Sequence, residues 1–305
     1  MTRISEIALQ QTLLAGFQRA QEAGQERQIQ LSTGKVSDAY SGIGVQTAQL
    51  LSAEGVVTRT TAFDGAANAA LSRLQAQEGA LTSLAETVDA LRSTLVASLA
   101  NGTGDAIGFE TETSALRSLS ALNASAGGVF VFGGTDGKTP PVAASTLADL
   151  AAATDTDALF AEGERARLAV EPGVAVDGGP LAADVGADII RLLGDIADAE
   201  TSLGGFSGPL DAAQRDFLTS QVAALEAIAG DIITAQGLNG VSQAQANDAL
   251  DRNVRARDLA EIVAAEIEDA DIAEVVSRLN QDQLAIQASA QALAQASQLS
   301  LLNFL

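Results

Sequence analysis

The sequence lacks the residue types on which most enzyme chemistry depends. It contains no Cys, no His and no Trp, its only Tyr is Tyr40, and its only Met is Met1. Without His or Cys, the chain cannot form a Ser-His-Asp triad, a thiolate nucleophile, a Cys/His zinc site or a His-ligated iron site. The absence of Cys also excludes a disulfide framework. We therefore expect a protein with no catalytic residue, no cofactor and no bound metal.

Aromatic residues and proline are also scarce. Aromatics make up 3% of the chain, while the hydrophobic 47% is mostly Ala and Leu, which suits closely packed helices rather than stacked sheets. All five prolines lie within residues 140–209: Pro140, Pro141, Pro172, Pro180 and Pro209. Because proline breaks helix interiors, these positions predict two proline-free helical arms around an irregular middle.

Basic residues are few, and the excess acid is unevenly distributed. The 17 basic and 39 acidic side chains give a net charge of −22, which argues against nucleic acid and anionic membranes as partners. Residues 1–59 are neutral overall and 271–305 carry a net −2, whereas 140–210 carry −9 and 211–270 carry −7. Chain ends are usually polar, so these nearly neutral ends indicate segments that become buried against a partner.

No uninterrupted apolar run approaches the roughly 18–20 residues of a membrane span. The N-terminal segment has an acidic residue at Glu6 and no continuous apolar stretch, so a cleavable signal peptide is not expected. These features fit a cytoplasmic protein, or one exported without a cleaved signal.

Both arms show the heptad spacing of paired helices. Apolar residues alternate steps of three and four, or recur every seven residues, in three segments, and a shorter stripe lies near the N-terminus. These residues are Leu74, Leu81, Leu84, Val88, Leu91 and Leu95; Leu218, Val222, Leu225, Ala229 and Ile232; Ile272, Leu279, Ile286 and Leu293; and Ile4, Ile7, Leu14 and Phe17.

Glycine-containing segments predict where the helices end. Breaks are expected at 32–34, at 41–44 and at 101–104. A further turn is predicted at 237–240, followed by a new helix that Ser242 and Gln245 would cap. In the middle, strands are expected at 167–170 and 174–176, and a helix near 185–200.

The predicted fold is mainly α: an antiparallel helical bundle or coiled-coil rod formed by the two arms, with a small mixed α+β insert. We expect three parts. Residues 1–44 with 270–305 would form a terminal assembly domain, residues 45–139 with 211–269 a helical rod domain that ends in a β-hairpin, and residues 140–210 a small outer domain.

The stretch GVFVFGGTDGKTPP, residues 128–141, is similar to a phosphate-binding loop, since a strand-like run precedes Gly-Lys-Thr. However, the position that needs the first glycine of such a loop is Phe132. Pro140 and Pro141 stand where the phosphate-binding helix would begin. The alternative is a hairpin in which the turn at 133–137 joins 129–132 to a second strand. Nucleotide binding through Lys138 remains as a remote alternative.

Both chain ends resemble the bacterial flagellin superfamily. QIQLSTGKVSDAYSGIG, residues 28–44, is similar to the turn that follows the first helix in that superfamily. Residues 269–305, with their Gln-rich heptads and closing Ser-Leu-Leu, resemble its C-terminal helix. Within the superfamily, VFVFGGTDGKTPPV is similar to a hairpin typical of the hook–filament junction proteins, the hook-associated protein three family.

The resemblance implies a structural component of the flagellum that joins the hook to the filament, with no enzymatic activity. It implies export through the type III channel and an extracellular position at the hook–filament junction. Terminal helices that are disordered in the free monomer would fold on docking. The implied partners are other copies in a ring, the first hook-associated protein, flagellin and an export chaperone, with no nucleic acid and no membrane.

We expect the assembly interface to consist of apolar residues at the two ends: Ile4, Ile7, Leu14, Phe17, Ile272, Leu279, Ile286, Leu293, Leu301, Leu302 and Phe304. The residues 40–44 depart from the usual flagellin turn, but a flagellin or minor filament subunit remains an alternative. A generic coiled-coil scaffold is a further one.

Overall fold

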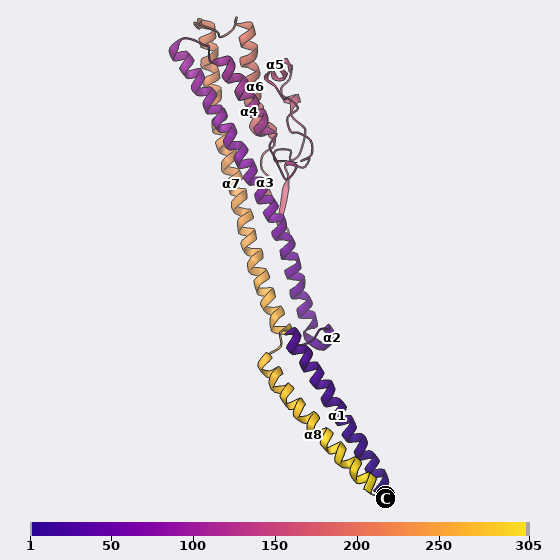
Figure 1. The fold of residues 1–305 in the computed structure, drawn as a ribbon. Helices are drawn as coiled ribbons and strands as arrows, with labels where there is room; N and C mark the ends of the chain where they lie inside the picture. The colour runs from indigo at the N-terminus through magenta and orange to yellow at the C-terminus, as the bar shows by residue number, and fades with distance from the viewer. Residues whose placement is uncertain (1, 303–305) are drawn as a thin grey trace. The chain divides into compact units, whose positions relative to one another are not determined.

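The computed structural model describes residues 2–302, and the side chains of residue 8 and of residues 11–295. Long helices dominate these residues, and the strands form only two-stranded pairs (Figure 1). The mainly α fold is therefore confirmed. The elements, in chain order, are α1 (Thr2–Thr33), α2 (Tyr40–Ile43), η1 (Gly44–Gln46), α3 (Thr47–Asn101), α4 (Ile107–Leu122), β1 (Ser125–Ala126), β2 (Val129–Phe130), α5 (Leu147–Ala152), η2 (Asp157–Leu159), β3 (Arg167–Glu171), β4 (Val174–Asp177), α6 (Ala182–Ser202), α7 (Ala212–Glu268) and α8 (Ile272–Leu302).

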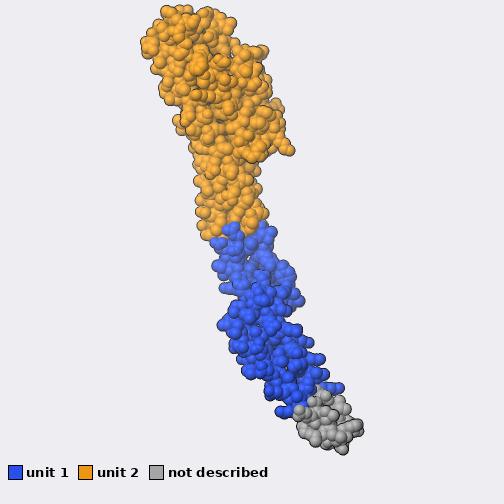
Figure 2. All heavy atoms as spheres, viewed as in Figure 1, with its two compact units in different colours: residues 1–58, 256–305 blue, residues 59–255 orange. Residues whose placement is uncertain are grey.

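The chain divides into two compact units, shown in different colours in Figure 2. Unit 1 contains residues 1–58 and 256–305, and unit 2 contains residues 59–255. The predicted helix ends at Gly34 and Gly102 are confirmed, since α1 and α3 end immediately before these glycines, whereas the break predicted at 41–44 contains the short helix α2, which ends before Gly44. All three glycines have a positive φ, between 69° and 73°, a backbone conformation that residues other than glycine rarely adopt.

The core of unit 2 is built on the predicted heptad residues of both arms. These side chains are fully buried in one cluster: Leu81, Leu84, Val88, Leu91 and Leu95 of α3, with Leu218, Leu225 and Ile232 of α7. Each buried Leu or Ile contributes roughly 1.5–3 kcal/mol through the removal of its apolar surface from water. The same cluster includes Val142, Leu150 and Ile189, so the middle of the chain shares this core with the arms. The predicted three-part domain division stays a prediction.

The predicted turn at residues 237–240 is wrong, because α7 runs without a break from Ala212 to Glu268. The heptad spacing continues through this segment with small and polar residues in place of Leu. Asn239, Ala246 and Asn253 follow Ile232 at steps of seven, and all three are buried. A glycine inside a helix costs only about 1 kcal/mol relative to Ala. Packing along this seam offsets the cost, and Ser242 is buried inside the helix instead of capping a new one.

Asn239 connects the two long helices of unit 2. Its Nδ2 donates to the backbone oxygen of Leu74 at 2.9 Å and to Oε2 of Glu78 at 2.8 Å. We expect Asn239→Ala to lower the free energy of unfolding by about 1–3 kcal/mol, because both acceptors lose a buried donor. Asn247→Ala is the matched control: its exposed Nδ2 donates only within α7, to Gln243, and a change of at most about 0.5 kcal/mol is expected. Equal losses in chemical denaturation would contradict this account.

The predicted hairpin at 129–132 exists with a different partner. β2 pairs with β1, which precedes it, through Ser125↔Phe130 and Ala126↔Val129. Gly127 and Gly128 make the turn with φ of 60° and 80°, and two consecutive positive φ values suit a tight hairpin turn. Residues 133–137 fold back instead of starting a strand, since the Phe130 amide donates to the Gly137 oxygen at 2.8 Å. In the middle, the predicted strands are confirmed as β3 and β4, and the predicted helix as α6.

By length and composition alone, α7 could cross a membrane: its most apolar 18-residue window has a mean hydropathy of 1.2, and 22% of that window is buried. One such helix is weak evidence of a membrane span. Leu218, Leu225 and Ile232 of the same helix are fully buried in the core of unit 2.

Candidate assembly surface

In unit 1, α1 and α8 lie side by side and run antiparallel (Figure 1). The Ala270 amide donates to the Gly34 oxygen at 2.8 Å, at the end of α1 and just before α8. Further along the pair, Gly24 is buried, and a Cβ at this position would lie 3.6 Å from Cδ1 of Ile286. The predicted pairing of the two chain ends is therefore present in the described residues.

The facing sides of this pair repeat at steps of three and four, but they are only partly apolar. On α8 the buried or half-buried positions are Val275, Leu279, Asp282, Ile286, Ser289, Ala292 and Leu293. On α1 they include Leu13, Phe17, Ala20, Gly24, Arg27 and Gln30. Polar groups on α1 bond locally: Nη1 of Arg27 donates to Oε1 of Gln30 at 2.8 Å, and Nε2 of Gln30 donates to the Val36 oxygen at 2.8 Å. Small and polar residues on the facing sides leave less apolar area to bury between the two helices.

The remaining apolar residues of unit 1 are largely exposed. Among its described side chains, the buried hydrophobic residues are Leu50, Ala53, Ala260, Ile267 and Val275. The exposed large hydrophobic residues are Leu14, Ile29, Leu31, Val36, Tyr40, Val45, Leu51, Leu259, Ile262, Ile272, Val276 and Leu284. A unit that exposes more large apolar side chains than it buries lacks a sufficient core of its own, and such surfaces mark interaction sites.

The predicted interface residues divide between the two sides of the pair. Phe17, Leu279, Ile286 and Leu293 are half-buried, on the facing sides, whereas Leu14 and Ile272 are each 45% exposed. The side chains of Ile4, Ile7, Leu301 and Leu302, and the whole of Phe304, lie outside the described residues. The sequence pattern did not indicate Ile29, Val276 or Leu284, which do not share the seven-residue spacing of the predicted set.

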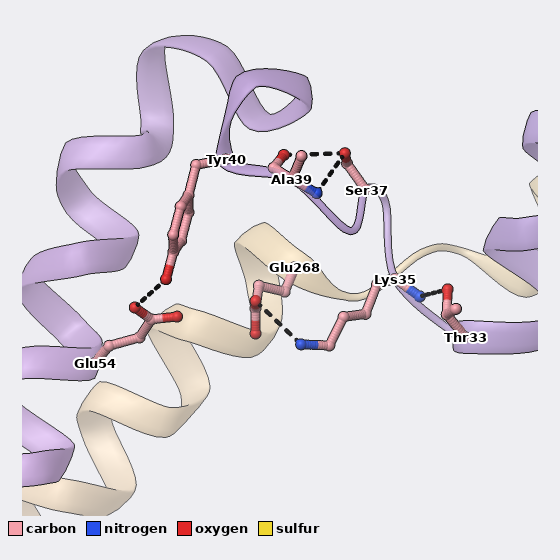
Figure 3. Close-up of polar contacts among 7 residues, drawn as sticks. All are labelled: Thr33, Lys35, Ser37, Ala39, Tyr40, Glu54 and Glu268. Carbon is pink, nitrogen blue, oxygen red and sulfur yellow. Dashed lines mark hydrogen bonds and ion pairs between the residues drawn. The ribbon is translucent and has the colours of Figure 1, made fainter.

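The loop between α1 and α3 is tied to the turn between α7 and α8. The Val36 amide donates to the Glu268 oxygen at 2.7 Å, and Lys35 and Asp269 form an isolated antiparallel bridge. The loop is also bonded within itself, because the Ser37 hydroxyl donates to the Ala39 oxygen and accepts from the Ala39 amide (Figure 3). Residues 28–44, which carry the flagellin resemblance, thus form an ordered junction at one end of the helix pair.

Two side-chain contacts connect this loop to the long helices. Nζ of Lys35 lies 3.2 Å from Oε1 of Glu268, and the Tyr40 hydroxyl donates to Oε2 of Glu54 at 3.0 Å (Figure 3). The bond to the Glu54 carboxylate raises the pKa of Tyr40, because it favours the protonated phenol. These exposed contacts line a cavity of about 570 Å³ and orient the loop, but each adds little stability.

In unit 2, the Gly-Lys-Thr segment differs from a phosphate-binding loop. The Lys138 amide donates to Oδ1 of Asp136 at 3.2 Å, and the Thr139 hydroxyl donates to Oδ2 of the same carboxylate at 2.9 Å. Both hydrogen bonds stabilise the ionised carboxylate and so lower the pKa of Asp136, the bond from the Thr139 hydroxyl more than the bond from the Lys138 amide. The groups that would hold a phosphate therefore bond to a carboxylate, and the next helix begins only at Leu147.

The backbone of the residues before Lys138 is bonded to two polar side chains of α3. Nε2 of the buried Gln77 donates to the Val131 oxygen at 2.7 Å and to the Gly178 oxygen at 3.1 Å. Nη2 of Arg73 donates to the oxygens of Val131 and Gly134 at 3.1 Å and 3.0 Å. Burial lowers the pKa of Arg73. Sequence reasoning missed both anchors, because a polar residue on a heptad helix gives no signal of a distant backbone partner.

Among the side chains that the structure describes, no group of three or more His, Cys, Asp or Glu residues is placed to hold a metal ion. The arrangement is suited to protein–protein association, with the exposed apolar residues of unit 1 as its candidate surface.

Comparison with known proteins agrees with this architecture. Residues 222–305 match the family model of the bacterial flagellin C-terminal helical region. No curated protein matches the sequence closely enough to count as a relative. A solved structure from Vibrio parahaemolyticus, described as a flagellar hook-associated protein, has a TM-score of 0.59 at 14% identity and covers 76% of this chain and 99% of its own. FlgL from Bacillus cereus has a TM-score of 0.50 at 13% identity and covers 69% of this chain and 98% of its own. The C-terminal region of this chain is thus flagellin-like in sequence. The fold of the chain is similar to those of the two solved structures.

Proposed function

We propose that this protein is a structural component of the bacterial flagellum, without catalytic activity, and that it acts as the adaptor between hook and filament. The observation that carries this proposal is the composition of unit 1. Its helix pair buries few hydrophobic residues, exposes many, and includes a region that matches the flagellin C-terminal family model. Such a surface gains its burial only when neighbouring subunits cover it.

Each of the three parts predicted from the sequence has its own role in this proposal. Residues 1–44 with 270–305 form the assembly domain, residues 45–139 with 211–269 form the connecting helices, and residues 140–210 face outward. The apolar residues of both ends, including Leu14, Phe17, Leu279 and Ile286, make the contacts between subunits. The partners are other copies in a ring, the first hook-associated protein and flagellin, after export with the help of a chaperone through the type III channel.

Immunogold labelling of isolated flagella tests the junction role. An antibody against this protein is expected to label one short zone where hook and filament meet. Labelling along the whole filament would overturn the junction assignment, while a complete absence of label from flagella would overturn the flagellar role.

A flagellin or minor filament subunit is the second candidate, because the matching family model is that of flagellin. Electron microscopy of the purified chain distinguishes the two roles. A filament subunit is expected to polymerise alone into long filaments, whereas an adaptor is expected to form at most short or closed assemblies.

A further inference from the structure

A groove on unit 2 runs between α6 and α7. Two cavities, of about 460 and 310 Å³, lie along these helices and share Asp231. Their α6 lining comes from one helical face, at steps of one and three residues: Asp184, Val185, Asp188, Arg191, Leu192 and Asp195. The segment from Asp184 to Asp195 spans roughly 16 Å at 1.5 Å per residue, about three helical turns.

The groove has an apolar floor and an acidic rim. Val185, Leu192, Ile228 and Ala235 are buried along it, and at one end Leu238 and Val241 line it while 61% and 54% exposed. Five carboxylates line the groove, Asp177, Asp184, Asp188, Asp195 and Asp231, against two arginines, Arg165 and Arg191. Apolar floors with charged rims are typical of sites that hold an amphipathic helix.

The charges that belong to the groove are not balanced within it. Arg165 pairs with Asp184 at 3.0 Å, and Arg191 pairs with Asp188 at 2.9 Å and with Asp157 at 3.0 Å. Among the described residues, neither arginine forms an ion pair with Asp195 or Asp231. Partial burial and the nearby Asp198 raise the pKa of Asp195, and the charge of Arg191 offsets this only in part.

We propose that the α6–α7 groove docks a cationic amphipathic helix of a partner protein, with its apolar residues over Leu238 and Leu192 and its Lys or Arg side chains beside Asp195 and Asp231. The acidic rim favours a cationic occupant, and a basic partner protein is a better match for it than a second copy of this chain, which carries a net charge of −22. This surface is separate from the assembly residues of unit 1 and gives unit 2 a partner of its own.

The test uses the purified full chain and a fluorescent 14-residue helical peptide, with leucines at i, i+3, i+4 and i+7 and lysines on both flanks. Fluorescence anisotropy measures its Kd. We expect binding that weakens as salt rises, and a Kd about tenfold higher for Asp195→Asn/Asp231→Asn, because this variant removes two carboxylates that pair with lysines of the peptide. Leu238→Ser is expected to weaken binding by about tenfold as well.

The matched control is Asp248→Asn/Asp251→Asn, which removes the same charge from exposed positions of α7 outside the groove. Its Kd is expected to stay within about twofold of that of the unmodified chain. Equal losses in both double variants would overturn the proposal, because they indicate attraction by net charge alone. Equal binding of a shuffled peptide, or no binding at all, would also overturn it. A self-association in sedimentation velocity that is lost only in Asp195→Asn/Asp231→Asn would also overturn it, because the occupant would then be a second copy of the chain.

Discussion

A chain that ends at Asp269 is expected to lose assembly completely while unit 2 keeps its fold. The truncation removes α8, which leaves the facing side of α1, including Phe17 and Gly24, without its partner. Both buried clusters of unit 2 lie entirely within residues 59–255, so their side chains stay covered. Removal of several apolar contacts of roughly 1.5–3 kcal/mol each leaves too little free energy for stable association.

Two measurements check this result. In a strain that lacks the native gene, the truncated chain should restore neither motility nor filaments in electron micrographs. Limited proteolysis of the purified truncated protein should yield a resistant fragment close to residues 59–255. Export is followed separately by the amount of protein in the medium, so that a failure of export is not mistaken for a failure of assembly.

A pair of point substitutions sharpens the same test. Leu284 is 66% exposed on α8, and Leu284→Asp is expected to block assembly because neighbouring subunits would have to bury its charge. Gln287→Asp, at an exposed polar position of the same helix, adds the same charge and should be tolerated. A truncated chain that still built a normal junction and filament, or equal effects of the two substitutions, would contradict the assembly role of α8.

Gly134→Ala is expected to produce the largest loss of stability from a single small substitution, about 3 kcal/mol. Gly134 has φ of 60°, and a Cβ there would lie 2.2 Å from the backbone oxygen of Glu164 and 2.6 Å from Cδ2 of Leu181. The positive φ costs roughly 1–2 kcal/mol, and the forced shift of a packed backbone adds roughly 1–3 kcal/mol. The displacement would also disturb the Gly134 oxygen that accepts from Arg73.

Gly127→Ala separates the two causes of this loss. Gly127 also has φ of 60°, but nothing lies within 4 Å of a Cβ built there. Gly127→Ala should therefore lower the free energy of unfolding by only about 1–2 kcal/mol, which is the cost of the positive φ alone. Denaturant unfolding gives both values, and the Tm of Gly134→Ala should fall by roughly 10 °C. If both variants lost the same free energy, the close approach of the 133–137 segment to Glu164 would not matter for stability.

The fold class could be predicted from the sequence because its signals are local. Leu81, Val88 and Leu95 recur every seven residues, and a seam of this kind requires a partner helix wherever it occurs. Gly34 and Gly102 end helices because no other residue adopts their φ readily. The neutral, apolar ends likewise led to the prediction of an assembly surface, which stays a prediction.

What only the tertiary structure decided depends on residues far apart in the chain. The continuity of α7 through Gly237 and Gly240 depends on contacts such as that of Asn239 with Leu74, 165 residues away. The exposed positions Ile29 and Leu284 became recognisable only once the facing sides of α1 and α8 were known.

The stretch at residues 128–141 illustrates the same limit. Its sequence excluded a standard phosphate loop through Phe132 and the two prolines, but it did not reveal what the glycines do. The structure places Gly134 against Glu164 and the backbone of this segment against Gln77. Local sequence sets the conformations that each residue can adopt, whereas the choice among them is made by long-range packing and hydrogen bonds, whose partners no local pattern identifies.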